Sequence, residues 1–301
     1  MLEHQEWKGD TGGTAWMHKV LIRLFRHIDI RCVYVFMALF VIPFYLLFSH
    51  RGYLAIYHYF RHRHKYGVWK SFRYTCLNHY RFGQVIMDRF ASYAGQKYHF
   101  VIDGNENFLR LLHSPDGFVI ISSHVGSYEM AGYTFQSVGK TYNALVYSGE
   151  SAAVMENRKR LLTENNIRMI PVSDDMSHIF AINEALSEGN IVSIPGDRVF
   201  GSPRTVECEL LGGKVQLPYG PYALAAQRGV PVIAIYVMKE AAYRYHVYIH
   251  QLNMVREDDH RKRDEKVNEL VHRFTETLES VLRKYPEQWF NYFDFWHEDG
   301  Q

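Results

Sequence analysis

The chain has 301 residues, which is enough for one large globular domain with an appendage, and its length does not require a second domain. It carries 34 Lys and Arg against 32 Asp and Glu. The resulting net charge of +2 excludes the strongly basic balance of a nucleic-acid-binding domain, so we expect no nucleic-acid partner. The aromatic fraction of 15% is high for a soluble enzyme and suits a protein that contacts lipid.

The three cysteines are scattered along the chain at Cys32, Cys76 and Cys208. Because they form no Cys-x-x-Cys pair, they predict neither a disulfide framework nor a zinc site, and they fit a reducing compartment. No cleavable signal peptide is expected, since the first apolar run begins only at Cys32 and no small-residue cleavage site follows closely. We therefore expect the start of the chain to be retained.

The first predicted element is a basic amphipathic helix. Its basic residues Lys19, Arg23, Arg26 and Arg31 occupy different faces from the apolar ones. Helices of this kind commonly lie in the headgroup layer of a membrane. The apolar residues recur at helical spacing and are Trp16, Val20, Leu21, Leu24, Phe25 and Ile28.

An uncharged segment follows between Arg31 and Arg51, and its apolar core, Cys32–Phe48, is at the short end of the roughly 17 to 25 residues that a spanning helix needs. Basic residues flank both ends, so a single span would place one basic group on the wrong side. Since Pro43 can bend the run, we favour a re-entrant or in-plane anchor. We predict an anchor over residues 1–56 and the main domain over 57–301. The alternative is a buried core helix preceded by a solvated basic helix.

The next segment, Tyr57–Arg89, is rich in Arg, His, Tyr and Phe. It could face anionic headgroups or an acidic carrier protein, or it could form helices with an ordinary solvated side.

From about Gly117 the pattern changes to short β-branched runs that alternate with helical stretches. This alternation predicts an α/β fold with a mainly parallel or mixed central sheet flanked by helices. A late amphipathic helix over Arg261–Arg283 is expected to cover the sheet, and Pro286, Trp289 and Phe290 are expected to pack the chain end back on the domain. The expected strands are Phe118–Ser123, Ala144–Tyr147, Ile167–Val172, Ile191–Ile194 and Val232–Val237, and the expected helices are Ala152–Asn165, Met176–Ser187 and Tyr219–Arg228.

A candidate catalytic pair follows the first strand of this region. His124 comes directly after an apolar strand, where the chemistry of parallel sheets gathers, and Glu129 follows five residues later. A turn and a first helical turn can return that carboxylate to the imidazole, where it fixes the tautomer and stabilises the imidazolium. Gly126 allows close approach of a substrate or of the backbone, and the helix start offers N–H groups to an oxyanion. A His and a Glu at this spacing are weak evidence alone in a chain with 17 histidines.

Several ordered blocks give the pair its context. SSHVGSYE contains His124 and Glu129, and further blocks are SIPGDR at Ser193–Arg198, the run Gly212–Val237, and PEQWF near the end. Together these blocks resemble the bacterial lipid A late acyltransferases of the lysophospholipid acyltransferase superfamily, whose signature is His-x-x-x-x-Asp or His-x-x-x-x-Glu. The resemblance runs from about Trp16 to Trp296 and includes the apolar N-terminal anchor.

The resemblance implies roles for individual residues. His124 would be the general base, Glu129 its partner, and Asp197 with Arg198 would lie close to the substrates. Arg198 suits an anionic acceptor or the oxyanion, or else pairs with Asp197 or another acid. Arg158 is a weaker candidate for a phosphate contact, or else a solvated helix charge. The chain departs from common members, which read Asn-Trp in place of Ser127 and the following Tyr, and often Gln or His in place of Arg198.

The resemblance also implies a function. It predicts an acyltransferase on the cytoplasmic face of a bacterial inner membrane that moves a fatty acyl group from acyl-carrier protein, or from a coenzyme A thioester, to a hydroxyl of a lipid A precursor or related glycolipid. No cofactor or metal is expected. The departures keep open another lipid acceptor, namely an amino-acid lipid, a lysophospholipid or a polyene lipid. A non-catalytic lipid-binding membrane protein is the remaining alternative, and the intact His124 and Glu129 favour catalysis.

Other chemistries are less well supported. The surroundings of Ser127 lack the Gly-x-Ser-x-Gly elbow of a serine hydrolase, and no Gly-rich phosphate loop implies a nucleotide. Two histidine groups could suggest a metal, but neither has a carboxylate or Cys at ligand spacing, so exposed histidines explain them better. These groups are His58, His62 and His64, and His246 and His250.

Overall fold

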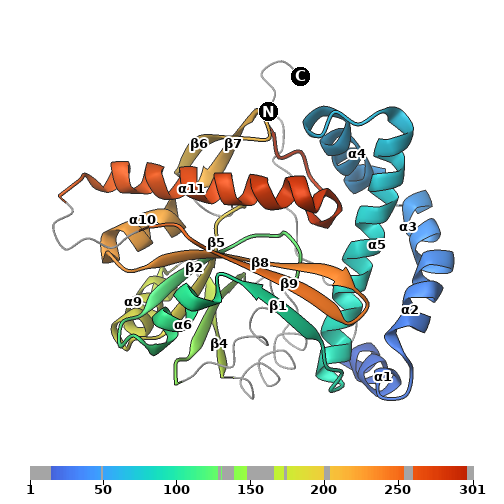
Figure 1. The fold of residues 1–301 in the computed structure, drawn as a ribbon, viewed down its shortest axis with the longest axis horizontal. Coiled ribbons are helices and arrows are strands. Elements are labelled where there is room, and N and C mark those ends of the chain that lie inside the picture. The colour runs from blue at the N-terminus through green and yellow to red at the C-terminus, as the bar shows by residue number, and fades with distance from the viewer. Residues whose placement is uncertain are drawn as a thin grey trace.

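A seven-stranded mixed sheet forms the centre of the protein in a computed structural model (Figure 1). The structure describes residues 15–48, 50–127, 130, 139–147, 166–172, 175–199, 204–253 and 260–296. The strand order is β1-β9-β8-β2-β5-β3-β4, and every neighbouring pair is parallel except β8 with β9. The predicted α/β class is therefore confirmed. The strands are β1 (His99–Asp103), β2 (Phe118–Ser122), β3 (Tyr142–Tyr147), β4 (Ile167–Val172), β5 (Ile191–Pro195), β8 (Val232–Ala241) and β9 (Arg244–Gln251).

Helices cover both faces of this sheet. The alternation along β2 places Val119 and Ile121 against one core, with α9, α10 and α11, and Phe118 and Ile120 against the other, with α6. The helices are α6 (Asn105–His113), α9 (Ser177–Ser187), α10 (Tyr219–Arg228) and α11 (Arg263–Lys284). In Figure 1, α11 crosses the sheet in orange-red at the top.

The sequence predicted some elements and missed others. The bounds predicted for β4 and α10 agree with the structure, and the strands β2, β3, β5 and β8 and the helices α9 and α11 are present close to their predicted positions. The predicted helix Ala152–Asn165 lies outside the described residues. The parts of the sheet domain that were not predicted include the edge strand β1, helix α6, the antiparallel strand β9, and the hairpin of β6 (Thr205–Leu210) with β7 (Gly213–Pro218).

The chain before the sheet folds as a layer of helices at one end of it, on the right in Figure 1. These are α1 (Ala15–Phe25), α2 (Ile30–Phe36), α3 (Ile42–Phe48), α4 (His50–His58) and the long α5 (Val68–Tyr93). A π-helical turn, η1 (Met37–Val41), joins α2 to α3, and a second, η2 (Tyr59–Arg63), follows α4.

Pro43 lies within helix α3. The helical path runs through the π-helical turn η1 into α3, and a sharp bend of 120° lies earlier, between Phe25 and Ile30. No single helix among the described residues is long and apolar enough to cross a membrane. In the part of the chain that the structure describes, one bent pair of helical stretches, Lys19–Phe25 with Ile30–Leu46, reaches the required length and hydropathy together.

A buried ion pair joins the helical layer to the sheet. Asp88 on α5 and Lys239 on β8 are both buried and in contact, and the hydroxyls of Tyr34 and Tyr245 donate to the same carboxylate. Burial raises the pKa of Asp88 despite the opposing effect of Lys239, and burial lowers the pKa of Lys239. One carboxylate thus connects α2, α5, β8 and β9.

Candidate active site

His124 and Asp197 meet at the carboxyl edge of the sheet. β2 and β5 are parallel neighbours, and their register pairs Ser122 with Pro195. His124 lies two residues beyond the end of β2 and Asp197 two residues beyond the end of β5. The two strands therefore deliver these side chains to the same place, which is where open parallel sheets carry their chemistry.

Asp197 holds His124 through both of its carboxylate oxygens. Asp197 Oδ1 lies 2.9 Å from His124 Nδ1, and Oδ2 accepts a hydrogen bond of 2.7 Å from the His124 backbone N–H. Asp197 is 0% exposed, whereas the His124 side chain is 24% exposed and so remains accessible from solvent.

The charge of Asp197 fixes the tautomer of His124. Burial alone would raise the pKa of Asp197, but the His124 imidazole, its hydrogen bonds and the charge of Arg198 together lower the pKa below its ordinary value. An ionised carboxylate only accepts hydrogen bonds, so His124 Nδ1 must be the donor. In neutral His124 the lone pair then lies on Nε2, which is the nitrogen that can take a proton.

The loop after His124 follows β8 closely, and this explains Gly126. Its φ of +63° is in the left-handed region, and a Cβ added there would come within 2.2 Å of the Val237 carbonyl oxygen. Ser127 N–H donates to the same carbonyl at 2.7 Å. Glycine is therefore required by the backbone of β8, and a substrate contact at Gly126 stays a prediction.

The end of the chain forms a strap over this loop, which we define as residues 286–291. The Gly126 N–H donates to the Gln288 carbonyl at 2.8 Å, Phe290 N–H donates to the His124 carbonyl at 3.0 Å, and Val125 forms an antiparallel bridge with Trp289. The strap thus pairs with the loop as a short strand would, and the predicted return of the chain end to the domain is confirmed.

Arg198 is turned toward the same strap. Its Nε donates to Asn291 Oδ1 at 2.8 Å and its Nη2 to the Phe290 carbonyl at 3.0 Å, while the guanidinium lies 5.5 Å from the centre of the Phe293 ring. These bonds place a permanent positive charge close to Asp197. The predicted contact of Arg198 with substrate stays a prediction.

Two predicted site residues lie outside the described residues. They are Glu129, the predicted partner of His124, and Arg158, the candidate phosphate contact. Within the described part of the chain, the carboxylate that contacts His124 Nδ1 belongs to Asp197. The sequence resemblance placed Asp197 near the substrates but did not predict its bond to His124. A signal was present, because both residues follow strands of a parallel sheet and so lie at the same edge of that sheet.

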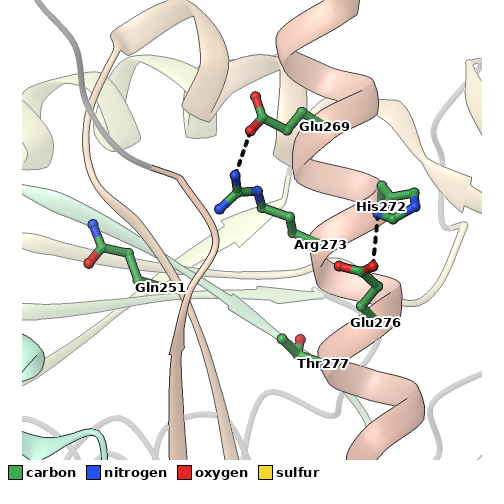
Figure 2. Close-up of a pocket in the computed structure, with 6 residues that line it drawn as sticks. All are labelled: Gln251, Glu269, His272, Arg273, Glu276 and Thr277. Carbon is green, nitrogen blue, oxygen red and sulfur yellow. Dashed lines mark ion pairs between the residues drawn. The ribbon is translucent and has the colours of Figure 1, made fainter.

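A surface pocket lies away from this site (Figure 2). Gln251 pairs with Ile233, four residues before Val237 on β8, so the pocket is about 13 Å along the strand from the His124 loop. On α11, Arg273 pairs with Glu269 at 2.9 Å, and His272 Nδ1 lies 3.5 Å from Glu276 Oε1. The pocket is lined by Gln251, Glu269, His272, Arg273, Glu276 and Thr277.

Comparison with known proteins gives one result that names a family. No curated protein matches the chain. The model of the bacterial lipid A biosynthesis acyltransferases matches residues 81–297, a range that contains His124, Asp197, Arg198 and the strap. Since this match covers more than half of the chain, the protein is an enzyme that belongs to the bacterial lipid A biosynthesis acyltransferase family.

Proposed function

We propose that this acyltransferase moves a fatty acyl group from an acyl thioester, with acyl-carrier protein as the donor, to a hydroxyl of a lipid A precursor or related glycolipid. The observation that carries the proposal is the bond between His124 Nδ1 and the buried Asp197, which leaves the basic lone pair on Nε2. The family match supplies the reaction class.

The proposed reaction is direct transfer. As the acceptor hydroxyl oxygen attacks the thioester carbonyl carbon, its proton passes to His124 Nε2, and the new C–O bond forms. When the tetrahedral intermediate collapses, the C–S bond breaks and the imidazolium returns the proton to the leaving sulfur. Asp197 stabilises the imidazolium in between, and Glu129 keeps its predicted role as a second partner.

The oxyanion of the intermediate needs donors. In the described loop, the amides of Gly126 and Ser127 are already bonded to the carbonyls of Gln288 and Val237. A backbone amide has one N–H, whereas the Arg198 guanidinium has five and uses two of them for Asn291 and Phe290. Its number of donors and its permanent charge favour Arg198 over these two amides as the stabilising group.

The acceptor is tested by mass spectrometry of total lipids from cells with and without the gene, complemented by wild type or by His124→Ala. We expect one lipid A species to lose an acyl chain without the gene and only the wild type to restore it. If lipid A is unchanged and an amino-acid lipid, lysophospholipid or polyene lipid loses its acyl group, the chemistry holds and the acceptor is wrong. No change in any lipid would contradict the proposal.

We further propose that the helical layer holds the enzyme on the cytoplasmic face of the inner membrane. Ile30, Tyr34 and Met37 pack inward in a buried cluster, whereas Phe36 and Phe40 are 57% and 62% exposed on the other side of the same helical path. Val35, Leu39, Val41 and Phe44 are exposed as well. Residues 11–87 also carry eleven Lys and Arg against a single acid, Asp29. An apolar surface with basic surroundings suits anionic lipid.

Vesicle binding tests this surface. Replacing Phe36 and Phe40 together with serine is expected to weaken sedimentation with vesicles of phosphatidylethanolamine and phosphatidylglycerol about tenfold or more, since each buried Phe contributes roughly 1.5–3 kcal/mol. Phe180→Ser is the matched control, because Phe180 is 77% exposed but lies on α9. Equal vesicle binding by the double variant and the control would contradict a role of this surface in membrane binding.

A further inference from the structure

Gln288 occupies the junction between the strap, strand β8 and the His124 loop. It is completely buried, and it ends the short 3₁₀ helix η3 (Pro286–Gln288). Its side-chain amide makes two hydrogen bonds with one residue of β8: Oε1 accepts from the Lys239 N–H at 2.8 Å and Nε2 donates to the Lys239 carbonyl at 2.8 Å. These are the two bonds that a neighbouring strand would supply.

The main chain of the same residue holds the loop. The Gln288 carbonyl accepts from the Gly126 N–H at 2.8 Å, two residues after His124. Phe290 N–H then bonds to the His124 carbonyl at 3.0 Å. One residue therefore binds β8 with its side chain and the His124 loop with its backbone, so the position of the loop depends on the fit of the Gln288 amide against Lys239.

Lys239, the residue of β8 that pairs with the Gln288 side chain, is itself held by further contacts. Lys239 directs its ammonium into the buried ion pair with Asp88, and β8 is paired with β9 through Tyr245 opposite Lys239. The loop also contacts β8 directly, through the bond of Ser127 N–H to the Val237 carbonyl. Gln288 thus connects the loop to a buried part of β8 at a second point, two residues beyond Val237.

We propose that Gln288 is a positioning residue for His124: its amide pairs with Lys239 and thereby holds the strap that fixes the backbone of the His124 loop. The proposal rests on the proposed role of His124 as general base. Loss of the amide would leave the buried N–H of Lys239 without a partner and allow strap and loop to shift. A displacement of about 1 Å between a base and its substrate can cost on the order of 100-fold in rate.

The test compares Gln288→Met, which keeps the length and removes both hydrogen bonds, with Tyr236→Phe as control. Tyr236 is also on β8, and Tyr236→Phe removes its 3.0 Å hydrogen bond to Thr277 Oγ1 on α11. This bond is on the face of the sheet that α11 covers and does not involve the strap. We expect Gln288→Met to lower kcat about 10- to 100-fold with KM within about twofold of wild type. Tyr236→Phe is expected to keep kcat within about twofold of wild type at a similar loss of thermal stability.

Hydrogen exchange separates this proposal from the proposed function. In Gln288→Met, peptides that contain residues 124–127 are expected to exchange faster, and the same peptides are expected to be unchanged in Tyr236→Phe. Equal kcat in the two variants, with unchanged exchange at 124–127, would overturn the positioning role. A wild-type enzyme that uses no acyl thioester would contradict the proposed function. The hydrogen-exchange result would then test by itself whether Gln288 positions the His124 loop. Should Gln288→Met fail to fold, Gln288→Asn keeps the amide but shortens its reach, and the same differences are expected on a smaller scale.

Discussion

Replacement of His124 with glutamine is expected to lower kcat about 1,000-fold, because the variant has no nitrogen that can take the acceptor proton. Glutamine keeps a polar side chain of similar length beside Asp197, so the fold is expected to remain intact. The measurement is transfer of a radiolabelled acyl group from an acyl thioester to the purified lipid acceptor, with thermal unfolding followed in parallel.

His246→Gln is a suitable control for this variant. His246 Nε2 lies 2.9 Å from Asp103 Oδ2 and Nδ1 lies 3.2 Å from Glu240 Oε1, so it is also a histidine held by carboxylates, but it is on β9. Its replacement is expected to leave kcat within about twofold of wild type. If His124→Gln kept a tenth or more of the wild-type kcat, His124 could not be the base.

Asp197→Asn is expected to reduce kcat about 100- to 1,000-fold. An asparagine can accept one of the two hydrogen bonds that His124 donates, but its NH₂ cannot accept the other, and it carries no charge to stabilise the imidazolium. The effect should therefore appear in kcat much more than in KM. A wild-type rate in Asp197→Asn together with an inactive Glu129→Gln would instead make Glu129 the sole functional partner.

The charge of Asp197 also makes the stability of the folded protein depend on pH. The pKa of Asp197 is lowered in the folded protein, so its carboxylate contributes stability that is fully present above the unfolded pKa of about 3.9 and is lost as the pH falls through the lower folded pKa. The difference in unfolding free energy between wild type and Asp197→Asn is thus expected to shrink as the pH falls below about 4. Urea unfolding at several pH values between about 2 and 5 measures it, and a difference that does not shrink below about pH 4 would contradict the assigned charge.

The C-terminal half of the fold shows which elements can be predicted from local sequence patterns. Short β-branched runs and amphipathic stretches are local properties, and so β4 and α10 could be predicted with their observed bounds. The hairpin of β6 and β7 was missed because its turn, Leu211 with Gly212, takes positive φ at both residues without the Asn-Gly or Asp-Gly pair that usually marks such turns. β9 alternates buried and partly buried residues, but its place between β8 and β1 depends on a segment far away in the chain.

The sequence by itself determined the α/β class, the position of His124 after a strand, and the blocks that mark an acyltransferase, because each is carried by neighbouring residues. Only the tertiary structure decided which groups surround His124. Asp197 is 73 residues away and reaches it because β5 lies beside β2 in parallel register. Gln288 reaches the loop because the chain end returns across β8. Such contacts follow from strand order and from the packing of distant segments, which no local pattern of residues specifies.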